Sequence, residues 1–382
     1  MTTGLATKHW TKGKLQDLVF FQRGFDITQA QQTEGPVPVI SSSGVTSYHS
    51  EARATGPGVV IGRKGTLGSV HYSEVDYWPH DTTLWSKDLR GNNPRFVYFY
   101  LHTINFKRFD VGNSNPTLNR NHIHDLPALI PPSDTQARIA DILSAYDDLI
   151  ENNRRRVALM EDAARQLYRE WFVRLRFPGH EHTRITNGVP EGWENTTAFS
   201  AMEVLSGGTP KTSVADYWDG EIPFYTPKDA SDTAYVLQTE RAITELGLKN
   251  CNSRLYDTNT VFISARGTVG KLNLASRPMA MSQSCYALLG KGFVPQMFLF
   301  CALKEAIEHF KQHAGGAVFD AIIVDTFKLI PFMVPDEKKV RLFEEAASPL
   351  FRQVANVMAQ NQKLRAARDL LLPCLMTGEI PV

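Results

Sequence analysis

Cysteine is scarce in this sequence of 382 residues. The four cysteines, Cys251, Cys285, Cys301 and Cys374, occur singly, and none forms a C-x-x-C pair. A disulfide framework or a zinc site built from cysteines needs paired thiols at short, regular spacings. The sequence therefore predicts free thiols in a reducing compartment.

Long hydrophobic runs are absent as well. No stretch approaches 18 uncharged apolar residues, and the N-terminal segment MTTGLATKHWTKG has no apolar core of signal-peptide length. Both features argue against a membrane span and against export. We expect a cytoplasmic protein with no membrane partner.

Neither sign of charge dominates. Lys and Arg total 41 and Asp and Glu total 40, which gives a formal net charge of +1. The whole chain is therefore not drawn to nucleic acid or membrane, and any site for a polyanion must come from local clustering. With 42% hydrophobic residues the chain is predicted to be globular, and its length allows two or three domains.

Motifs for nucleotide and methyl-donor chemistry are missing. The chain has neither G-x-x-x-x-G-K-[ST] nor a glycine-rich loop between a strand and a helix. The nearest match, Gly62 to Thr66, leads into another strand. The segment Asn115-Pro116-Thr117 lacks the second proline and the aromatic residue of the amino-methyltransferase motif. We interpret both segments as turns and predict no catalytic residue.

The histidines do not form a metal-binding pattern. His71, His80, His122 and His124 provide no helical i, i+4 pair accompanied by a third ligand. We predict no metal site and interpret these four as surface or base-contacting histidines.

What the sequence does contain is an internal repeat. Residues 59–68, VVIGRKGTLG, are matched by residues 261–270, VFISARGTVG, and each segment predicts a strand, a glycine turn and a second strand. Further matches follow in order: Trp10 with Trp193, Pro38 with Pro223, Pro94 with Pro295, Pro127 and Pro131 with Pro331 and Pro335, and Asn153 with Asn361. The separation grows from about 183 to about 208 residues, as expected of duplicated units with small loop insertions.

Each repeat is predicted to be a globular part followed by a long helix. Short strands separated by Gly, Pro, Ser and Asn, with one amphipathic helix in the first part, indicate a mixed α+β fold. The predicted boundaries are 1–132 for the first globular domain, 133–178 for the first spacer helix, 179–190 for a linker, 191–335 for the second globular domain and 336–382 for the second spacer helix with a C-terminal tail.

The two long helices carry heptad patterns typical of coiled coils. With Ile139 at position a, positions a and d of the first helix take Ile142, Tyr146, Leu149, Met160, Ala163 and Leu167. The second helix places Phe343, Ala347, Leu350, Val354, Val357, Leu364, Leu371 and Leu375 in the same way. A helix of roughly 40 residues is about 60 Å long, which indicates a spacer.

Two asparagines interrupt these heptads at equivalent places. Asn153 and Asn361 both fall at position a, near the middles of their helices. We predict that the helices pair antiparallel, with a pseudo-twofold relation between the repeats, so that the two asparagines meet and fix the register at some cost in stability. Pro349 is predicted to kink the second helix or to restart it near Ser348.

Polar side chains on and around the repeated glycine turns have the chemistry of DNA contacts. Arg, Lys, Asn and Gln can reach base edges, while hydroxyls and backbone amides contact phosphates. The predicted DNA-binding residues are Ser41, Ser42, Ser43, Tyr48, Arg63, Lys64, Thr66, Asn113, Asn115 and Arg120 in the first domain, and Lys211, Lys228, Arg266, Thr268 and Lys271 in the second. The domains share a scaffold but differ in their loops, as two different recognition sequences require. The alternative is that these are ordinary polar loops.

This duplicated pattern resembles the specificity (S) subunit of type I restriction-modification enzymes over nearly the whole chain. The matching segments are EGW at 191–193, SGGTP at 206–210, SARGTVG at 264–270, LPALIPP at 126–132 with QARIA at 136–140, and LMTGEI at 375–380. The first unit departs from the pattern because it lacks the Gly-Gly-Thr-Pro segment.

The resemblance implies two tandem target recognition domains, each binding one half of a bipartite, asymmetric site in double-stranded DNA. The two long antiparallel helices would act as a ruler for the gap and would dock two methyltransferase (M) subunits, with restriction (R) subunits in the full complex. S-adenosylmethionine, ATP and Mg are then expected on those partners, and no cofactor on this chain. Two alternatives stay open: a structural coiled-coil adaptor without DNA specificity, and a restriction-methylation fusion enzyme.

Overall fold

The chain divides into two compact units, and each takes a segment of both long helices. A computed structural model describes residues 9–109, 117–313 and 321–382. Unit 1 comprises Met1–Ile150 with Lys363–Val382, and unit 2 comprises Glu151–Gln362. The boundary therefore falls inside the helices and not in a loop.

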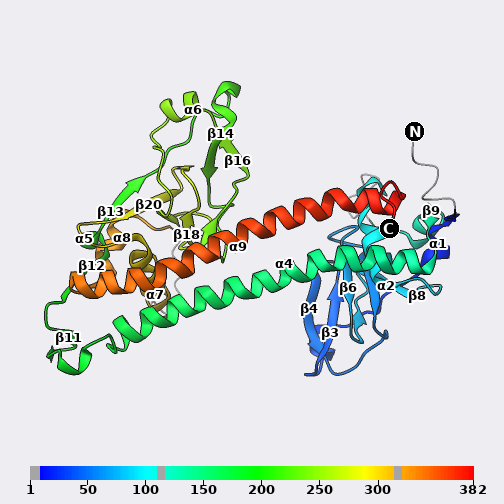
Figure 1. Cartoon of the computed structure of the whole chain (residues 1–382), viewed down its shortest axis with the longest axis horizontal. Helices are drawn as coiled ribbons and strands as arrows, with labels where there is room; N and C mark the ends of the chain where they lie inside the picture. Colours follow the sequence, from blue (N-terminus) through cyan, green and yellow to red (C-terminus); the bar gives the residue numbers. More distant parts are fainter. Residues whose placement is uncertain (1–8, 110–116, 314–320) are drawn as a thin grey trace. The chain divides into compact units, whose positions relative to one another are not determined.

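Unit 1 is an α+β domain built on a four-stranded sheet of order β2-β8-β5-β6, with a three-stranded sheet β4-β3-β7 and the pair β1-β9 (Figure 1). Its strands are β1 (Thr11–Lys14), β2 (Phe20–Arg23), β3 (Val37–Ser41), β4 (Gly44–His49), β5 (Gly58–Gly62), β6 (Val70–Ser73), β7 (Trp78–Pro79), β8 (Thr83–Asp88) and β9 (Pro127–Ile130). Its short helices are α1 (Leu15–Leu18), η1 (Gln29–Gln31), α2 (Pro94–His102), η2 (Phe106–Phe109) and α3 (Arg120–His124).

Unit 2 has a five-stranded sheet of order β13-β20-β17-β18-β15, a three-stranded sheet β16-β14-β19, and the pairs β12-β21 and β10-β11. Its strands are β10 (Ile185–Thr186), β11 (Val189–Pro190), β12 (Glu194–Thr197), β13 (Met202–Ser206), β14 (Trp218–Tyr225), β15 (Tyr235–Val236), β16 (Arg241–Ile243), β17 (Val261–Ser264), β18 (Leu272–Ala275), β19 (Ala280–Met281), β20 (Cys285–Gly290) and β21 (Pro331–Val334). Its helices are η4 (His180–His182), α5 (Ala198–Ala201), η5 (Ala215–Tyr217), α6 (Glu245–Lys249), α7 (Gln296–His313) and α8 (Val324–Leu329).

The predicted internal repeat is confirmed strand by strand. The core order β2-β8-β5-β6 of unit 1 recurs as β13-β20-β17-β18 in unit 2. In each unit a second sheet contains one parallel pair, β3 with β7 and β14 with β19. The mixed α+β fold class predicted from the sequence is therefore confirmed, and equivalent residues in the two units can be compared directly.

The core of unit 1 includes the ends of both long helices. Every residue of β5 is buried, and α2 packs its apolar residues over the sheet. Asn93 begins α2 by accepting a hydrogen bond from the Phe96 amide at 3.0 Å, as expected of an N-cap residue. Leu143 of the first long helix and Leu375 of the second join the same buried cluster. Burying these apolar side chains stabilises domain and helices together.

An aromatic cluster joins the helix segments of unit 2 to its domain. The rings of Phe172 and Phe298 meet edge to face at 5.1 Å, and Phe343 lies 5.4 Å from Phe172. Tyr168 packs against Phe343 at 5.8 Å. Such edge-to-face contacts add roughly 0.5–1.5 kcal/mol each beyond burial, so this end of the helix pair is anchored firmly.

The long helices are α4 (Ser133–Tyr168), continued by the π-helical turn η3 (Arg169–Val173), and α9 (Glu337–Thr377). Within unit 2, Asn153 meets Asn361 while Tyr168 meets Phe343, so the two segments run antiparallel (Figure 1). The predicted antiparallel pairing is confirmed. None of the helices in the described residues is long and apolar enough to cross a bilayer.

The heptad frame predicted for the first helix is wrong at its d positions. Ile142 is 37% exposed and Leu149 is 44% exposed, whereas the next residues, Leu143 and Ile150, are buried. Position a is right at Ile139, which is buried. The difference arises because α4 faces its domain as well as α9, and the core of unit 1 takes Leu143.

Pro349 does not restart the second helix. The helical assignment of α9 continues through it, from Glu337 to Thr377. The proline ring is exposed, and Ala347 and Phe351 on either side are buried in the core of unit 2. Tertiary packing on both flanks outweighs the loss of one backbone donor.

Candidate nucleic-acid interface

The two glycine turns singled out from the sequence have the same backbone conformation. Gly65 and Gly68 have φ of 75° and 74°, and Gly267 and Gly270 have 76° and 78°. L-residues rarely adopt these angles, which explains why glycine stands at all four positions. In each turn the amide of the second glycine donates a hydrogen bond to a carbonyl at the end of the preceding strand. The length of this bond is 2.8 Å in both units.

In unit 1 the turn gathers most of the predicted DNA-binding residues. The Ser69 hydroxyl donates to the Thr66 carbonyl at 3.0 Å and also to the Ser42 carbonyl, which holds the loop of residues 41–43 against the turn. The Leu118 amide donates to the Arg63 carbonyl at 2.9 Å and places Arg120 nearby, at the start of α3. The structure therefore brings together Ser41, Ser42, Ser43, Arg63, Lys64, Thr66 and Arg120.

Of the other predicted residues of unit 1, Tyr48 does not join this group. Tyr48 lies towards the other end of β4, opposite Pro38, with 60% of its surface exposed. Asn113 and Asn115 lie outside the described residues.

In unit 2 the equivalent turn gathers a different set. The Thr268 hydroxyl donates to the Pro227 carbonyl at 2.9 Å, which brings Lys228 to the turn. Lys228 lies 3.6 Å from the Glu240 carboxylate, and Lys271 is ion-paired with Asp232. Arg266 and Thr268 are exposed on the turn itself.

Lys211 lies elsewhere in unit 2. Its carbonyl accepts a hydrogen bond from the Trp218 indole at 3.2 Å, which places it at the start of β14.

The structure refines which cations are equivalent. Since Gly65 matches Gly267, Lys64 corresponds to Arg266, and both are cationic. Arg63 corresponds to Ala265, as the match of residues 59–68 with 261–270 already indicates, so Arg63 and Lys271 are not equivalent. Ser69 is the residue equivalent to Lys271.

His124 is not a surface or base-contacting residue, contrary to the prediction. It is buried, its Nε2 accepts a hydrogen bond from the Phe21 amide at 2.9 Å, and its ring stacks on Phe20 at 4.7 Å. Burial, with a further contribution from the Arg120 charge, lowers the pKa of His124 below its ordinary value. His71 does belong to the turn region, because its Nε2 lies 3.2 Å from the Ser42 carbonyl.

Sequence reasoning missed two charged residues that flank the turn. Arg23 at the end of β2 and Asp81 before β8 form an ion pair of 3.0 Å. The sequence feature that could have located them is Gly24, which follows Arg23 directly. A Cβ at this position would lie 2.1 Å from the carbonyl oxygen of His80, the residue before Asp81. A Cβ on Gly207 would lie 2.3 Å from the equivalent Ser282 carbonyl oxygen. The first unit therefore retains one glycine of the Gly-Gly-Thr-Pro segment, and the repeat extends through Arg23.

One group of side chains in the described residues has metal-binding composition. Asp26, His80 and Asp81 can bring one ligand atom each within 4.8 Å of one another. The Asp81 carboxylate is already paired with Arg23, which lowers the negative charge available to a cation. We assign no metal to this group.

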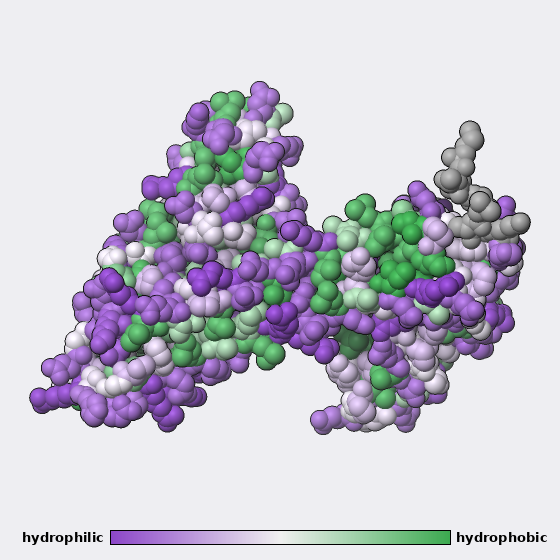
Figure 2. All heavy atoms as spheres, in the orientation of Figure 1, coloured by the Kyte–Doolittle hydropathy of each residue, from purple (hydrophilic) through white to green (hydrophobic). Residues whose placement is uncertain are grey.

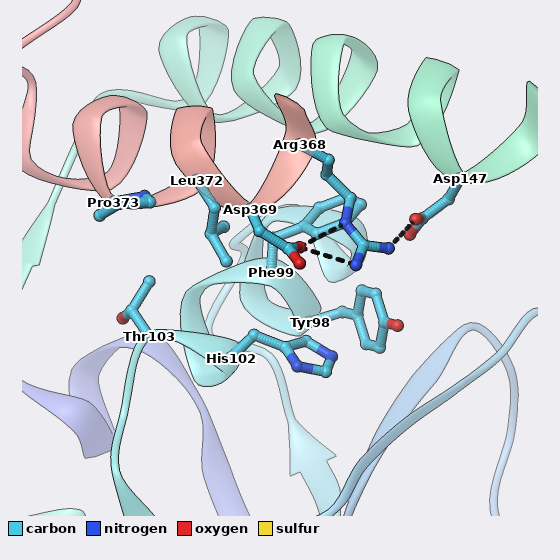
Figure 3. Close-up of a pocket in the computed structure, with 9 residues that line it drawn as sticks. All are labelled: Tyr98, Phe99, His102, Thr103, Asp147, Arg368, Asp369, Leu372 and Pro373. Carbon is cyan, nitrogen blue, oxygen red and sulfur yellow. Dashed lines mark hydrogen bonds and ion pairs between the residues drawn. The ribbon is translucent and has the colours of Figure 1, made fainter. Parts of the chain in front are cut away.

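A pocket of about 490 Å³ opens in unit 1 where α2 faces the C-terminal part of α9 (Figure 3). Arg368 bridges the carboxylates of Asp147 and Asp369, so its charge is balanced within the pocket. Burial, together with the Arg368 charge, lowers the pKa of His102, whose ring meets Tyr98 edge to face at 4.7 Å. Figure 2 shows hydrophobic residues gathered over this part of α9, where Leu370 is 74% exposed.

Comparison with known protein families identifies the two repeats. The model of the type I restriction modification DNA specificity domain matches residues 7–160 and again residues 190–347. The chain belongs to this family.

Known specificity subunits are similar to it along most of their length. The MjaIX specificity subunit of Methanocaldococcus jannaschii is 23% identical over 299 residues, covering 75% of this chain and 69% of the relative. The HindI specificity subunit of Haemophilus influenzae is 21% identical over 355 residues, covering 75% of this chain and 77% of the relative. The crystal structure of a type I S subunit from M. genitalium superposes with a TM-score of 0.63 at 15% identity over 96% of each chain. That likeness shows a shared fold, and the family match makes this chain a type I specificity subunit with two DNA specificity domains.

Proposed function

We propose that each domain of this specificity subunit reads one half of a bipartite, asymmetric site in double-stranded DNA, and that the paired helices set the gap between the halves. One observation carries the proposal. The two glycine turns share their backbone conformation, yet the side chains around them differ from unit to unit. A common scaffold with different polar groups is what two different half-sites require.

The helices and the pocket beside them are the proposed docking surface for two methyltransferase subunits. Ile142 and Leu149 on α4 and Leu370 on α9 are exposed apolar residues of unit 1. Exposed apolar side chains on a helix are typical of protein interfaces. Restriction subunits join in the full complex. S-adenosylmethionine, ATP and Mg are assigned to these partners, and this chain is proposed to be non-catalytic.

Sequencing of modified bases tests this function directly. The chain is expressed with its methyltransferase subunits in cells that lack other methyltransferases, and methylated adenines are mapped across the genome. We expect one bipartite motif with a fixed gap, which disappears when this chain is omitted.

Two other results would contradict the proposal, each in its own way. Methylation without a defined motif would support a coiled-coil adaptor that has no DNA specificity. Methyl transfer by the purified chain alone, with S-adenosylmethionine, would support a fusion enzyme. A variant of a methyltransferase subunit without its methyl-donor site is the matched control, since it must abolish the signal while the complex still assembles.

A further inference from the structure

One end of the central sheet in unit 1 carries a cluster of charged side chains beside the glycine turn. Strand β8 lies between β2 and β5: its Leu84 pairs with Arg23 of β2, and its Thr83 pairs with Gly62 of β5. Arg23 and Arg63 therefore lie on the two sides of the segment that leads into β8. The Arg63 amide donates to the Thr82 carbonyl at 2.8 Å, which fixes the start of the turn against that segment.

The two arginines of this cluster differ in their partners. Arg23 is neutralised by Asp81 at 3.0 Å. The Nη1 atom of Arg63 is buried and has no hydrogen-bond partner among the described residues. Burial, followed by repulsion from Arg23, also lowers the pKa of Arg63. A buried donor without an acceptor is rare and unfavourable in a folded protein, so this guanidinium gains by moving to an acceptor supplied from outside.

The same sheet end in unit 2 carries different side chains. Gly24 and Gly207 press against equivalent carbonyls, and Gly65 and Gly267 have the same conformation. These fixed points make Ser206 equivalent to Arg23, Gln283 to Asp81, and Ala265 to Arg63. Gln283 is exposed, and its Oε1 accepts a hydrogen bond from the Thr209 hydroxyl, which orients the amide.

Residues that the two units retain and residues that they exchange lie side by side here. Lys64 and Arg266 are retained as cations, and Thr66 and Thr268 as hydroxyls, on identical turns. Contacts to phosphate do not depend on base sequence, so retained groups fit the DNA backbone. Groups exchanged at the same end of a common scaffold fit the reading of different bases.

We propose that this sheet end is the base-reading position of each domain, where Arg63 reads a guanine in one half-site and Gln283 reads an adenine in the other. The inference rests on the proposed function and names the residues that give it specificity. Arginine donates two hydrogen bonds to O6 and N7 of guanine in the major groove, and glutamine matches N6 and N7 of adenine. Asp81 keeps Arg23 in place, so Arg63 is the cation left with an unfilled donor.

The test uses the complete complex with its methyltransferase subunits and maps the methylated motif of each variant. In Arg63→Ala we expect the preference for guanine at one position of the first half-site to fall by roughly tenfold or more, with the second half-site unchanged. In Gln283→Ala we expect the same loss at one adenine of the other half-site. Arg63→Gln supplies a gain of function, because it is expected to favour adenine where the wild type favours guanine.

Lys64→Ala is the matched control, since it removes a cation from the same turn. It is expected to weaken binding evenly across sequences and to lower the slope of log affinity against log salt by about 1. Assembly of each variant with the methyltransferase subunits, followed by gel filtration, separates loss of reading from loss of folding.

Failure of the inference can be told from failure of the proposed function. If the wild type methylates a bipartite motif but Arg63→Ala and Gln283→Ala leave every base preference intact, the base-reading assignment is wrong while the function stands. An even loss at all sites in Arg63→Ala overturns it too, because that is the behaviour of a phosphate contact. If the wild type has no bipartite motif, the function itself fails.

Discussion

Buried polar side chains in this protein differ in whether the fold supplies them with hydrogen-bond partners. His124 accepts the Phe21 amide and stacks on Phe20, so it stabilises the domain. Glu161 accepts the Ala234 amide at 2.6 Å, and burial raises the pKa of its carboxyl. Arg63 keeps an unpaired Nη1. Satisfied buried groups hold the fold together, whereas an unsatisfied donor such as Arg63 Nη1 gains by binding an acceptor.

The hydrogen bond of His124 makes unit 1 sensitive to acid. Its pKa in the folded protein is lowered, so the unfolded chain binds the proton more tightly. The stability contributed by His124 is therefore complete above its ordinary pKa of 6.5 and is lost as the pH falls through that value towards the lowered one. Urea unfolding between pH 5 and 8 should show this loss for the wild type.

Substitution of the same residue tests the cause. His124→Phe keeps an aromatic ring but removes the hydrogen-bond acceptor. It should lower the free energy of unfolding by about 1 kcal/mol at pH 8 and abolish the loss of stability in acid. His122→Phe is the control, because His122 lies exposed on the same short helix. Equal acid sensitivity in the wild type and in His124→Phe would assign the effect to another group.

At the level of elements, the sequence predicted what glycine conformation and helical periodicity determine locally. The strand, turn and strand around Gly65 follow from its backbone requirement, and the long helices follow from their heptads. The choice between Ile142 and Leu143 could not be made, because both neighbours are apolar and only the packing of α4 against its domain decides between them. The sheet-end cluster was missed for the same reason: Arg23 and Arg63 are 40 residues apart and meet only through strand order.

The asparagine pair is the polar element of the helix seam. Asn153 Nδ2 donates to Asn361 Oδ1 at 2.9 Å, and both residues are buried. A buried polar pair of this kind lowers stability but disfavours shifted registers. That it fixes the register here stays a prediction.

Replacing both asparagines by leucine tests it. Asn153→Leu with Asn361→Leu is expected to raise the urea midpoint and to allow methylation at sites with more than one gap length. Asn152→Leu, at an exposed position one residue away, should change neither property. Unchanged stability together with a single gap length in the double variant would argue that apolar packing alone sets the register.

At the level of the whole molecule, both units depend on the long helices. Unit 1 buries Leu143 and Leu375 in its core, and unit 2 buries Tyr168 and Phe343. The helices cross the boundary between units without a loop, at Ile150 in α4 and at Gln362 in α9. On the proposed function, helix length then sets the distance between half-sites.

Insertion of one heptad into each helix beside that boundary should lengthen the tolerated gap. Seven helical residues add about 10 Å, or about three base pairs at 3.4 Å each. Motif mapping should return both half-sites unchanged with a longer gap. A glycine-rich insertion of seven residues in each helix serves as control and should abolish the fixed gap, because glycine disfavours the helix. An unchanged gap in the heptad variant would show that the helices do not measure it.

The helix ends buried in each domain core also determine how this protein can be rebuilt from parts. Unit 2 is one continuous stretch, Glu151–Gln362, whereas unit 1 is two stretches that meet only in the folded chain. Exchange of a single internal gene segment can therefore replace unit 2 whole, together with its share of both helices, and leave unit 1 intact. On the proposed function, recombination inside the helices, next to the asparagine pair, would exchange the half-site read by unit 2 and keep the half-site read by unit 1.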